Sequence, residues 1–427
     1  MRASHRISIW TALLLLVAVN LYLFRSKLAH RDHANQQDYQ KERQSYEKDA
    51  ALGDREAMNK LGVVYLMGQG VPVDYAKAKE WFQRSADAGD TAAMDNLALM
   101  YERGQGVQGD YQQARQWYEK SADAWNGRAM AHLGYLYEKG HGVPQDYQMA
   151  RELYEKAIEL GDAHAMSDLG SLYEHGLGVP RDYQKAREWY EKGVAARDCA
   201  AMTHIGSLYH EGRGVLPDYK KAREWYQRSM AAGCITAMGN IGILYHNGQG
   251  VMRDYGQAKS WYEKAAAAGD RWAMDDLANM YERGEGVLQD DDKARQWYEK
   301  AAAAGNAHSM KYLGTLYERG QGVPRNQEMA REWYEKAANA GELSAMIHVG
   351  TLYYWGQGVP QNYGTAKQWY QKAADAGDAK SMRYVGYLYE HGEGVAPDNR
   401  QARLWYEKAA RAGDEDARQA LQALPSN

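Results

Sequence analysis

The chain has 427 residues, of which 45% are hydrophobic and 25% are charged. This is the ordinary composition of a folded protein and excludes an intrinsically disordered chain. The formal net charge is −4, with both signs interspersed along the sequence. A nucleic-acid partner is not expected, because the sequence lacks the basic stripe that a phosphate backbone requires.

The N-terminal segment is apolar and is flanked by basic residues. Residues 7–24 form an almost wholly apolar run, which as a helix would span ~27 Å, the short end for a membrane helix. A secretory signal peptide would have a shorter apolar stretch and a small-residue cleavage site, which is not evident. We predict that residues 1–24 are an uncleaved signal anchor, with a cleaved signal peptide as the alternative, and that residues 25–37 are a linker.

Both alternatives export the rest of the chain. We expect an inner-membrane-anchored protein with a periplasmic repeat domain, or a periplasmic protein if the N-terminal segment is cleaved. Basic residues lie on both sides of the apolar run, so the flanking charge leaves the membrane orientation open.

The remainder of the sequence repeats with a period of 36 residues. Methionines recur at that interval: Met58, Met94, Met130, Met166, Met202, Met238, Met274, Met310, Met346 and Met382. Self-similarity at this period is typical of a solenoid, in which one supersecondary unit stacks on copies of itself.

One repeat, residues 162–197, shows the predicted unit. Apolar residues at helical spacing predict a first helix, and a second apolar stripe begins at Tyr183. Gly176 is suited to end the first helix in a left-handed cap, Pro180 prevents its continuation, and Asp182 is placed to cap the second helix. The unit is therefore a helix–turn–helix hairpin.

A small residue interrupts the first helix of every repeat. Gly170 occupies this place in the repeat described above, and the residue is Gly in eight of the ten repeats and Ala in the other two, Ala98 and Ala278. Gly inside a helix costs about 1 kcal/mol relative to Ala. Its recurrence predicts a close approach between two helices at this place.

The ends of the repeat array are half units. Residues 38–54 copy a second helix and form an N-terminal half-repeat cap, residues 55–413 hold ten full repeats, and residues 414–427 form a C-terminal cap helix and tail. Repeat stacks require atypical terminal units to seal the core. The predicted fold is all-α: a right-handed α-solenoid of ten 36-residue helix–turn–helix repeats with half-repeat caps.

The chain has two cysteines, Cys199 and Cys234, at nearly matching places in successive repeats. Packed helices lie roughly 8–10 Å apart, whereas a disulfide needs Cα atoms within ~7 Å. This spacing disfavours a bridge, and the sequence leaves the pairing open.

The repeats resemble the SEL-one-like repeat family, a relative of the tetratricopeptide repeats with a longer loop. The motif reads AMSDLGSLYEHGLGVPRDYQKAREWYEKG from Ala165 and AMIHVGTLYYWGQGVPQNYGTAKQWYQKAADAG from Ala345. The resemblance implies an adaptor, often of the bacterial envelope; the family includes immunity proteins that neutralise phospholipase toxins, envelope assembly factors and host-protein binders. A cysteine-rich branch is associated with penicillin binding and β-lactamase activity, but this chain lacks its paired cysteines.

No catalytic, cofactor or metal motif accompanies the repeats. The Gly-x-Gly pair of each loop follows a helix rather than a strand, unlike a nucleotide-binding loop. The acidic run at residues 290–292 lacks the ligand spacing of a calcium loop. Histidines at matching places are 72 or 144 residues apart, too far for shared zinc bonds of ~2.0–2.1 Å. We expect no enzyme, no cofactor and no metal.

Variation among the repeats indicates where a partner would bind. On the first helix, the places two before, two after, five after and nine after each repeated methionine vary freely and lie on one helical face. In solenoids the concave surface lined by such helices is the usual binding face. The alternative is that these places vary only because they are exposed.

Aromatic residues outside the regular positions are enriched towards the C-terminal repeats, and exposed Tyr and Trp are favoured at binding hot spots. We predict a partner-binding patch on the concave side of residues 272–391, made of Trp272, His308, Tyr312, His348, Tyr354, Trp355, Tyr384, Tyr387 and His391.

The sequence thus predicts a non-enzymatic protein-binding scaffold of the bacterial envelope. Resemblance favours an immunity protein that binds and neutralises a phospholipase-type toxin of a secretion system. The alternative is an envelope assembly or signalling adaptor, and a peptidoglycan-related hydrolase or a penicillin-binding activity is the least favoured function. The sequence identifies neither the partner nor the oligomeric state.

Overall fold

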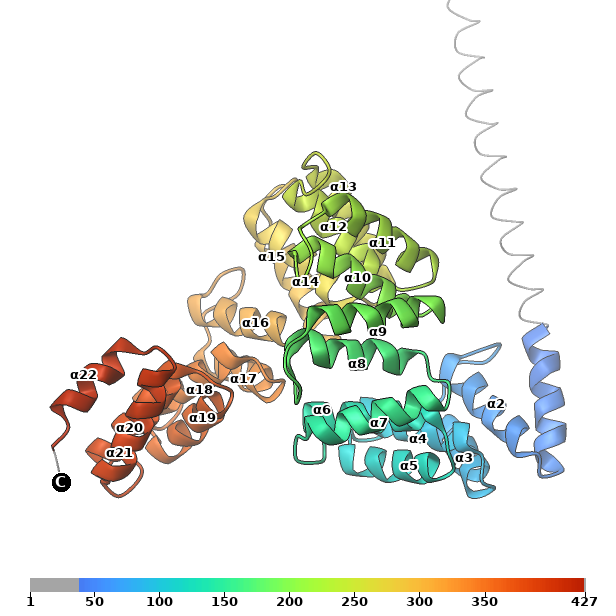
Figure 1. Cartoon of the computed structure of the whole chain (residues 1–427), viewed down its shortest axis with the longest axis horizontal. Helices are drawn as coiled ribbons and strands as arrows, with labels where there is room; N and C mark the ends of the chain where they lie inside the picture. The colour runs from blue at the N-terminus through green and yellow to red at the C-terminus, as the bar shows by residue number, and fades with distance from the viewer. Residues whose placement is uncertain (1–37, 426–427) are drawn as a thin grey trace, which may run out of the picture. The chain divides into compact units, whose positions relative to one another are not determined.

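The computed structural model describes residues 38–425 and is helical throughout this range, in which no strand occurs (Figure 1). The chain divides between His204 and Ile205 into two compact units. We refer to them as the N-terminal unit, described from residue 38, and the C-terminal unit, described to residue 425.

Each repeat contributes a first helix, helix A, and a second helix, helix B. The A helices are α2 (Arg55–Met67), α4 (Thr91–Arg103), α6 (Gly127–Lys139), α8 (His164–His175), α10 (Cys199–Glu211), α12 (Thr236–Asn247), α14 (Arg271–Arg283), α16 (Ala307–Arg319), α18 (Leu343–Trp355) and α20 (Ala379–His391). The B helices are α3 (Tyr75–Asp87), α5 (Tyr111–Asp123), α7 (Tyr147–Glu159), α9 (Tyr183–Ala195), α11 (Tyr219–Ala231), α13 (Tyr255–Ala267), α15 (Asp291–Ala303), α17 (Gln327–Asn339), α19 (Tyr363–Asp375) and α21 (Asn399–Arg411). A helix over residues 38–51 precedes α2, and α22 (Glu415–Ala423) follows α21.

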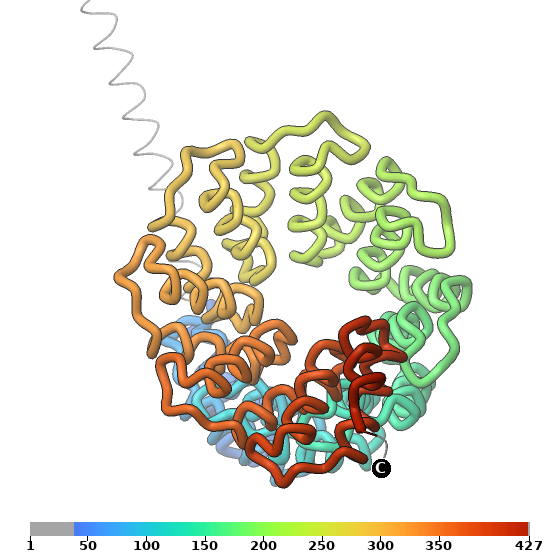
Figure 2. Tube along the Cα trace, turned by 90° about the vertical axis from the view of Figure 1, so that its left-hand side faces the viewer, coloured from blue at the N-terminus to red at the C-terminus, as the bar shows by residue number. Residues whose placement is uncertain are grey.

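Consecutive helices pack side by side within each unit. In the N-terminal unit α6 packs against α7, α7 packs against α8, and α8 also touches α6. The same alternation runs from α14 to α22 in the C-terminal unit, where the chain forms successive helical hairpins (Figure 2). Ten tandem hairpins stacked in this way form an α-solenoid, so the predicted all-α solenoid fold is confirmed.

The hairpin loop is held by the residues that the sequence indicated. Gly176 ends α8 in the left-handed conformation with φ 71°, and its N–H donates to the carbonyl of Leu172. The Asp182 side chain begins α9 by accepting hydrogen bonds from the N–H groups of Gln184 and Lys185, both at 3.0 Å. The left-handed cap and the aspartate cap satisfy backbone groups that helix ends leave without partners.

The core of each repeat is a helix B ring packed on a helix A glycine. Tyr190 is fully buried, and a Cβ atom added at Gly170 would lie 2.5 Å from a carbon of its ring. The same contact recurs in seven other repeats, between Gly62 and Phe82, Gly134 and Tyr154, Gly206 and Tyr226, Gly242 and Tyr262, Gly314 and Tyr334, Gly350 and Tyr370, and Gly386 and Tyr406. The predicted close approach of two helices is therefore a ring lying on bare backbone.

A hydrogen bond at the far end of the ring fastens the same two helices. The Tyr190 hydroxyl donates to the Glu174 carboxylate, 16 residues earlier on helix A, at 2.5 Å. Five other repeats make this bond, from Tyr118, Tyr154, Tyr298, Tyr334 and Tyr406. A buried carboxylate is costly unless it accepts hydrogen bonds, so this hydroxyl stabilises Glu174, which is itself buried.

Neither cysteine is a free thiol: Cys199 and Cys234 are each disulfide-bonded. The expectation that helix spacing disfavours a bridge is therefore wrong. The expectation used the roughly 8–10 Å distance between the axes of packed helices. Cys199 is the first residue of α10, but Cys234 lies in the turn before α12 and not in a helix, so this distance does not apply to the pair.

No helix within residues 38–425 is long and apolar enough to cross a bilayer. The predicted signal anchor at residues 1–24 and the linker at 25–37 lie outside the described residues.

The ring–glycine contact predicts different outcomes for one substitution at two glycines. Gly170→Ala crowds the Tyr190 ring, whereas Gly239→Ala in α12 faces no ring, its nearest atom being Asp270 Oδ2 at 3.2 Å. Ala gains about 1 kcal/mol of helix propensity at both sites, but overpacking costs about 1–3 kcal/mol at Gly170. Because Ala98 and Ala278 are tolerated at the same place, we expect the low end of that cost.

Urea unfolding should therefore show Gly170→Ala to be less stable than Gly239→Ala by about 1–2 kcal/mol. Equal stabilisation by both substitutions would contradict the ring–glycine contact.

Candidate functional site

All nine predicted partner-binding residues lie in the C-terminal unit, where the structure separates them into two groups. Trp272, His308 and Tyr312 lie on α14 and α16. The second group comprises Tyr354, Trp355, Tyr384, Tyr387 and His391, on α18 and α20, and His348 lies on α18 with its side chain exposed.

The first group borders an acidic hollow. Trp272, 55% exposed, lines a hollow of about 260 Å³ together with Asp270, Asp275 and Asp276. Asp270 caps α14 by accepting hydrogen bonds from two N–H groups of its first turn. Asp275 is buried and accepts hydrogen bonds from Ser309 and from the ring of His308, whose Nδ1 lies 3.0 Å away.

Asp276 differs from its two acidic neighbours because its side chain makes no hydrogen bond or ion pair with any described residue. Burial, followed by the charges of Asp275 and Asp270, raises the pKa of Asp276 to about 7, and the nearby His308 opposes this shift. The surroundings of Asp276 therefore disfavour the ionised form of its carboxyl group at neutral pH.

Several predicted residues take part in packing between repeats. The place two residues after the repeated methionine carries a ring in five repeats, and that ring lies on the core tyrosine of the preceding repeat. The pairs and their ring-centroid distances are His132 on Tyr118 (5.0 Å), His204 on Tyr190 (4.7 Å), Tyr312 on Tyr298 (5.2 Å), His348 on Tyr334 (5.0 Å) and Tyr384 on Tyr370 (4.9 Å). Tyr312, His348 and Tyr384 therefore contribute to the stacking of repeats, whatever else they bind.

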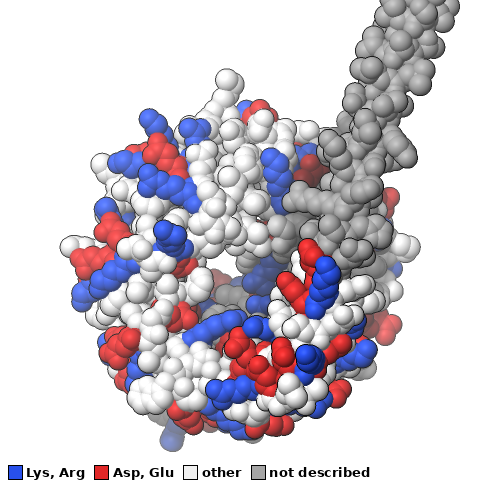
Figure 3. All heavy atoms as spheres, turned by 90° about the vertical axis from the view of Figure 1, so that its right-hand side faces the viewer, with Lys and Arg blue, Asp and Glu red and all other residues white. Residues whose placement is uncertain are grey.

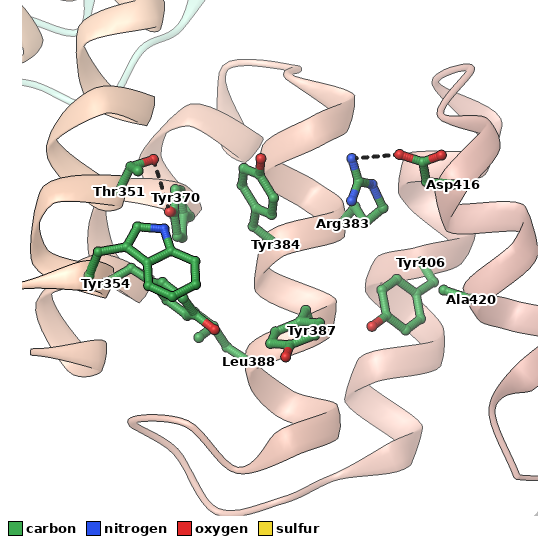
Figure 4. Close-up of a pocket in the computed structure, with 11 residues that line it drawn as sticks. Thr351, Tyr354, Tyr370, Arg383, Tyr384, Tyr387, Leu388, Tyr406, Asp416 and Ala420 are labelled. Carbon is green, nitrogen blue, oxygen red and sulfur yellow. Dashed lines mark hydrogen bonds and ion pairs between the residues drawn. The ribbon is translucent and has the colours of Figure 1, made fainter.

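The second group surrounds a larger, mostly aromatic hollow. It encloses about 370 Å³ between α18 and α22. We call it the aromatic groove and define it by the six rings that line it: Tyr354, Trp355, Tyr370, Tyr384, Tyr387 and Tyr406. Figure 4 shows Tyr384 and Tyr387 on one helix, facing Tyr354 on one side and Tyr406 on the other.

Two rings of the aromatic groove reach solvent. Trp355 is 64% exposed and Tyr387 is 39% exposed. Trp355 meets the Tyr354 ring edge-on at 4.8 Å, and His391 stacks on Tyr387 at 3.9 Å. Burial, followed by the neighbouring Glu393 carboxylate, raises the pKa of Tyr354, so this hydroxyl stays protonated at neutral pH.

An ion-pair network closes one end of the aromatic groove. Arg383 Nε lies 2.9 Å from Asp414 Oδ1. Its Nη2 lies 3.0 Å from Asp416 Oδ2, the pair drawn in Figure 4. Asp414 also caps α22, so the guanidinium fastens the final helix to α20. This network could not be predicted from the sequence, because Arg383 and Asp416 come together only when the terminal half-repeat packs on the last full repeat.

Three further exposed apolar side chains lie elsewhere in the C-terminal unit and were not predicted. Leu216, Met252 and Leu288 are 87%, 88% and 91% exposed. They occupy one loop place in consecutive repeats, 36 residues apart, where the neighbouring repeats carry Pro180 and Pro324. The repeat alignment itself is the signal that could have identified them.

On the one face shown in Figure 3, the charged side chains of the described residues do not form a patch of one sign. Lys and Arg side chains alternate with Asp and Glu on the face shown in Figure 3. Among residues 38–425, no three His, Cys, Asp or Glu side chains are arranged to hold a metal ion.

The helical pairs match the family model for the Sel1 repeat at residues 55–90, 91–124, 127–162, 163–198, 199–234, 235–270, 273–306, 307–342, 343–378 and 379–414. The chain belongs to the Sel1 repeat family. Repeats of this family form non-enzymatic protein-interaction scaffolds.

Solved structures of Sel1 repeat proteins are similar to this chain. A Sel1 repeat protein from Oxalobacter formigenes is 30% identical, with 73% of this chain and 90% of that chain covered and a TM-score of 0.50. The protective antigen c5321 of uropathogenic Escherichia coli is 32% identical over 89% of this chain and 82% of that chain, with a TM-score of 0.44. The immunity protein Pa5087 of Pseudomonas aeruginosa is 20% identical over 50% and 81%, with a TM-score of 0.41. No curated protein matches the chain.

The raised pKa of Asp276 predicts a pH-dependent gain in stability for Asp276→Asn. The folded-state pKa of about 7 lies above the ordinary value of 3.8, so ionisation of Asp276 opposes folding. The penalty is absent below about pH 4, grows as the pH rises to 7 and is complete above 7. Asn is compatible with this place because Asn96 and Asn240 occupy it in other repeats.

We expect Asp276→Asn to be more stable than the wild type at pH 8 by on the order of 2 kcal/mol, less than the full value of the shift because the carboxylate is partly exposed. The difference should vanish near pH 4. Thermal unfolding across this range measures it, with Asp291→Asn, an exposed carboxylate, as the control. A pH-independent difference would contradict the raised pKa.

Proposed function

We propose that this chain is a protein-binding scaffold of the bacterial envelope and that the aromatic groove is part of its binding surface. One observation supports this location: Trp355 and Tyr387, 64% and 39% exposed, stand with Tyr354 at the mouth of a hollow walled by three further rings. Trp and Tyr that sit in pockets are the residues on which binding hot spots concentrate. The family to which the chain belongs consists of interaction scaffolds.

The walls of the aromatic groove are rigid enough to serve as a preformed site. Tyr384 lies against Tyr370, Arg383 ties α20 to Asp414 and Asp416, and the Thr351 hydroxyl lies 3.2 Å from that of Tyr370. A site whose side chains are already held loses little conformational entropy on binding.

The partner class that we propose is a toxin that acts on the envelope, so that the chain acts as an immunity protein. This proposal rests on the resemblance to a family that includes immunity proteins against phospholipase toxins. The N-terminal apolar run at residues 7–24 supports a membrane-anchored protein with its repeats in the periplasm, because export places the scaffold in the compartment where such a toxin acts. An envelope assembly partner is the other outcome that the experiment below would reveal.

The experiment compares capture of envelope proteins by the full-length protein and by single-residue variants. Trp355→Ala removes an exposed side chain that no core ring depends on, so we expect loss of the captured partner by at least tenfold with little change in melting temperature. Leu288→Ala is the matched control, because it removes an equally exposed apolar side chain far along the sequence from the aromatic groove.

Tyr312 and Tyr384 are unsuitable for alanine substitution because they also stack on core tyrosines. Mass spectrometry then identifies the captured protein, and co-expression tests whether the chain protects cells from it. Equal capture by wild type and Trp355→Ala would exclude the aromatic groove, and a partner that is harmless to cells would replace the immunity role with an assembly role.

A further inference from the structure

The exposed tryptophan of the aromatic groove differs from the nine tryptophans on the B helices in one respect. Each of those nine has the Lys or Arg three residues later placed over its ring, 3.8–4.8 Å from the ring centroid: Trp81, Trp117, Trp189, Trp225, Trp261, Trp297, Trp333, Trp369 and Trp405. Trp355 is followed at the same distance in sequence by Gly358, and within residues 38–425 no cation lies over it.

The same is true of two other rings at the mouth of the aromatic groove. Among the described residues, neither Tyr354 nor Tyr387 has a Lys or Arg over its ring, whereas Tyr384 has both Lys380 and Arg383, at 5.6 and 5.4 Å. Aromatic faces carry negative electrostatic potential and attract cations. The mouth of the groove therefore presents three rings that the chain itself leaves without a cation.

Carboxylates around these rings outnumber the cations that balance them. The single guanidinium of Arg383 is shared by Asp414 and Asp416, and the Asp416 side chain remains 70% exposed. The Glu393 carboxylate acts on Tyr354, and one of its oxygens, Oε2, is buried and makes no hydrogen bond within residues 38–425. A carboxylate oxygen that accepts no hydrogen bond, beside low-dielectric ring walls, produces a negative field that extends into the groove.

We propose that the aromatic groove receives a basic side chain of the partner protein, an arginine or a lysine, with its charge over the rings of Trp355, Tyr354 and Tyr387. This inference rests on the proposed scaffold function and specifies the chemistry of its partner. The hollow of about 370 Å³ is larger than one guanidinium group, so an apolar neighbour of the basic residue enters with it and packs against Tyr384. Arg383 does not compete for the rings at the mouth, because two aspartates already hold it.

The test uses two synthetic tripeptide amides and the full-length protein labelled with 5-fluorotryptophan. One probe is acetyl-leucyl-arginyl-leucinamide, and the other replaces arginine by citrulline, which has nearly the same shape without the charge. The fluorine resonance of Trp355 is assigned with Trp355→Phe, which retains an aromatic ring. We expect the arginine probe to shift this resonance and to bind about fivefold more tightly than the citrulline probe.

Substitutions of the carboxylates test the source of this preference. Glu393→Gln and Asp416→Asn should each weaken the arginine probe severalfold and leave the citrulline probe unchanged. Asp292→Asn, a change of an exposed carboxylate remote in sequence from the groove, should affect neither probe. Unchanged binding of the arginine probe in both groove variants would overturn the electrostatic part of the argument.

The remaining outcomes separate this inference from the scaffold function. Equal affinity for the two probes would show an apolar site and overturn the basic anchor. Binding of choline chloride in preference to the arginine probe would assign the site to lipid headgroups instead. If partner capture depends on Trp355 while neither peptide moves its resonance, the scaffold function stands and the basic anchor fails. If neither capture nor peptide binding depends on Trp355, both proposals fail.

Discussion

The close contact between a helix B ring and a helix A glycine is the constraint on which the rest of the structure depends. With Tyr190 on the bare backbone of Gly170, the hydroxyl reaches the Glu174 carboxylate at the end of the same helix, so one side chain sets both the spacing and the register of a hairpin. The first repeat shows that these two features belong together. There Phe82 has no hydroxyl, and Leu66 stands where six other repeats carry the carboxylate. In the ninth repeat Tyr354 occupies the place of the glutamate, and the Tyr370 hydroxyl lies within hydrogen-bond distance of the Thr351 hydroxyl instead. The Tyr354 ring therefore lines the aromatic groove.

The sequence was sufficient for most of the fold because each element of a repeat has its own local signal. The left-handed glycine at Gly176 and the cap at Asp182 are backbone requirements that neighbouring repeats do not alter. Contacts between repeats were harder to foresee. Four predicted residues do line one groove, but Tyr384 also packs on the core ring of the preceding repeat, a role that spacing within a single helix does not reveal. The pairing of Arg383 with Asp416 depends on the packing of the final helix, and the bonded state of Cys199 depends on turn geometry.

The chain balances most of its aromatic rings and charges locally, and a few residues are exceptions. A lysine or arginine one turn along the helix covers each helix B tryptophan, and most core tyrosine hydroxyls have a carboxylate. Asp276 lacks any such partner, and Trp355 lacks a cation. Local rules that are followed in most repeats and broken in a few indicate where selection has favoured something other than stability.

The end of the array leaves one position of the stack unfilled. In five repeats a ring two residues after the repeated methionine covers the preceding core tyrosine, as Tyr384 covers Tyr370. Counting 36 residues on from Tyr384 leads to Ala420 in α22, which borders the aromatic groove beside Tyr406. A methyl group there leaves open the space that a larger side chain would occupy. The number of repeats at this end is therefore constrained. A duplicated repeat with a ring at the place of Ala420 would fill the aromatic groove, whereas repeats added at the opposite end would leave the groove open.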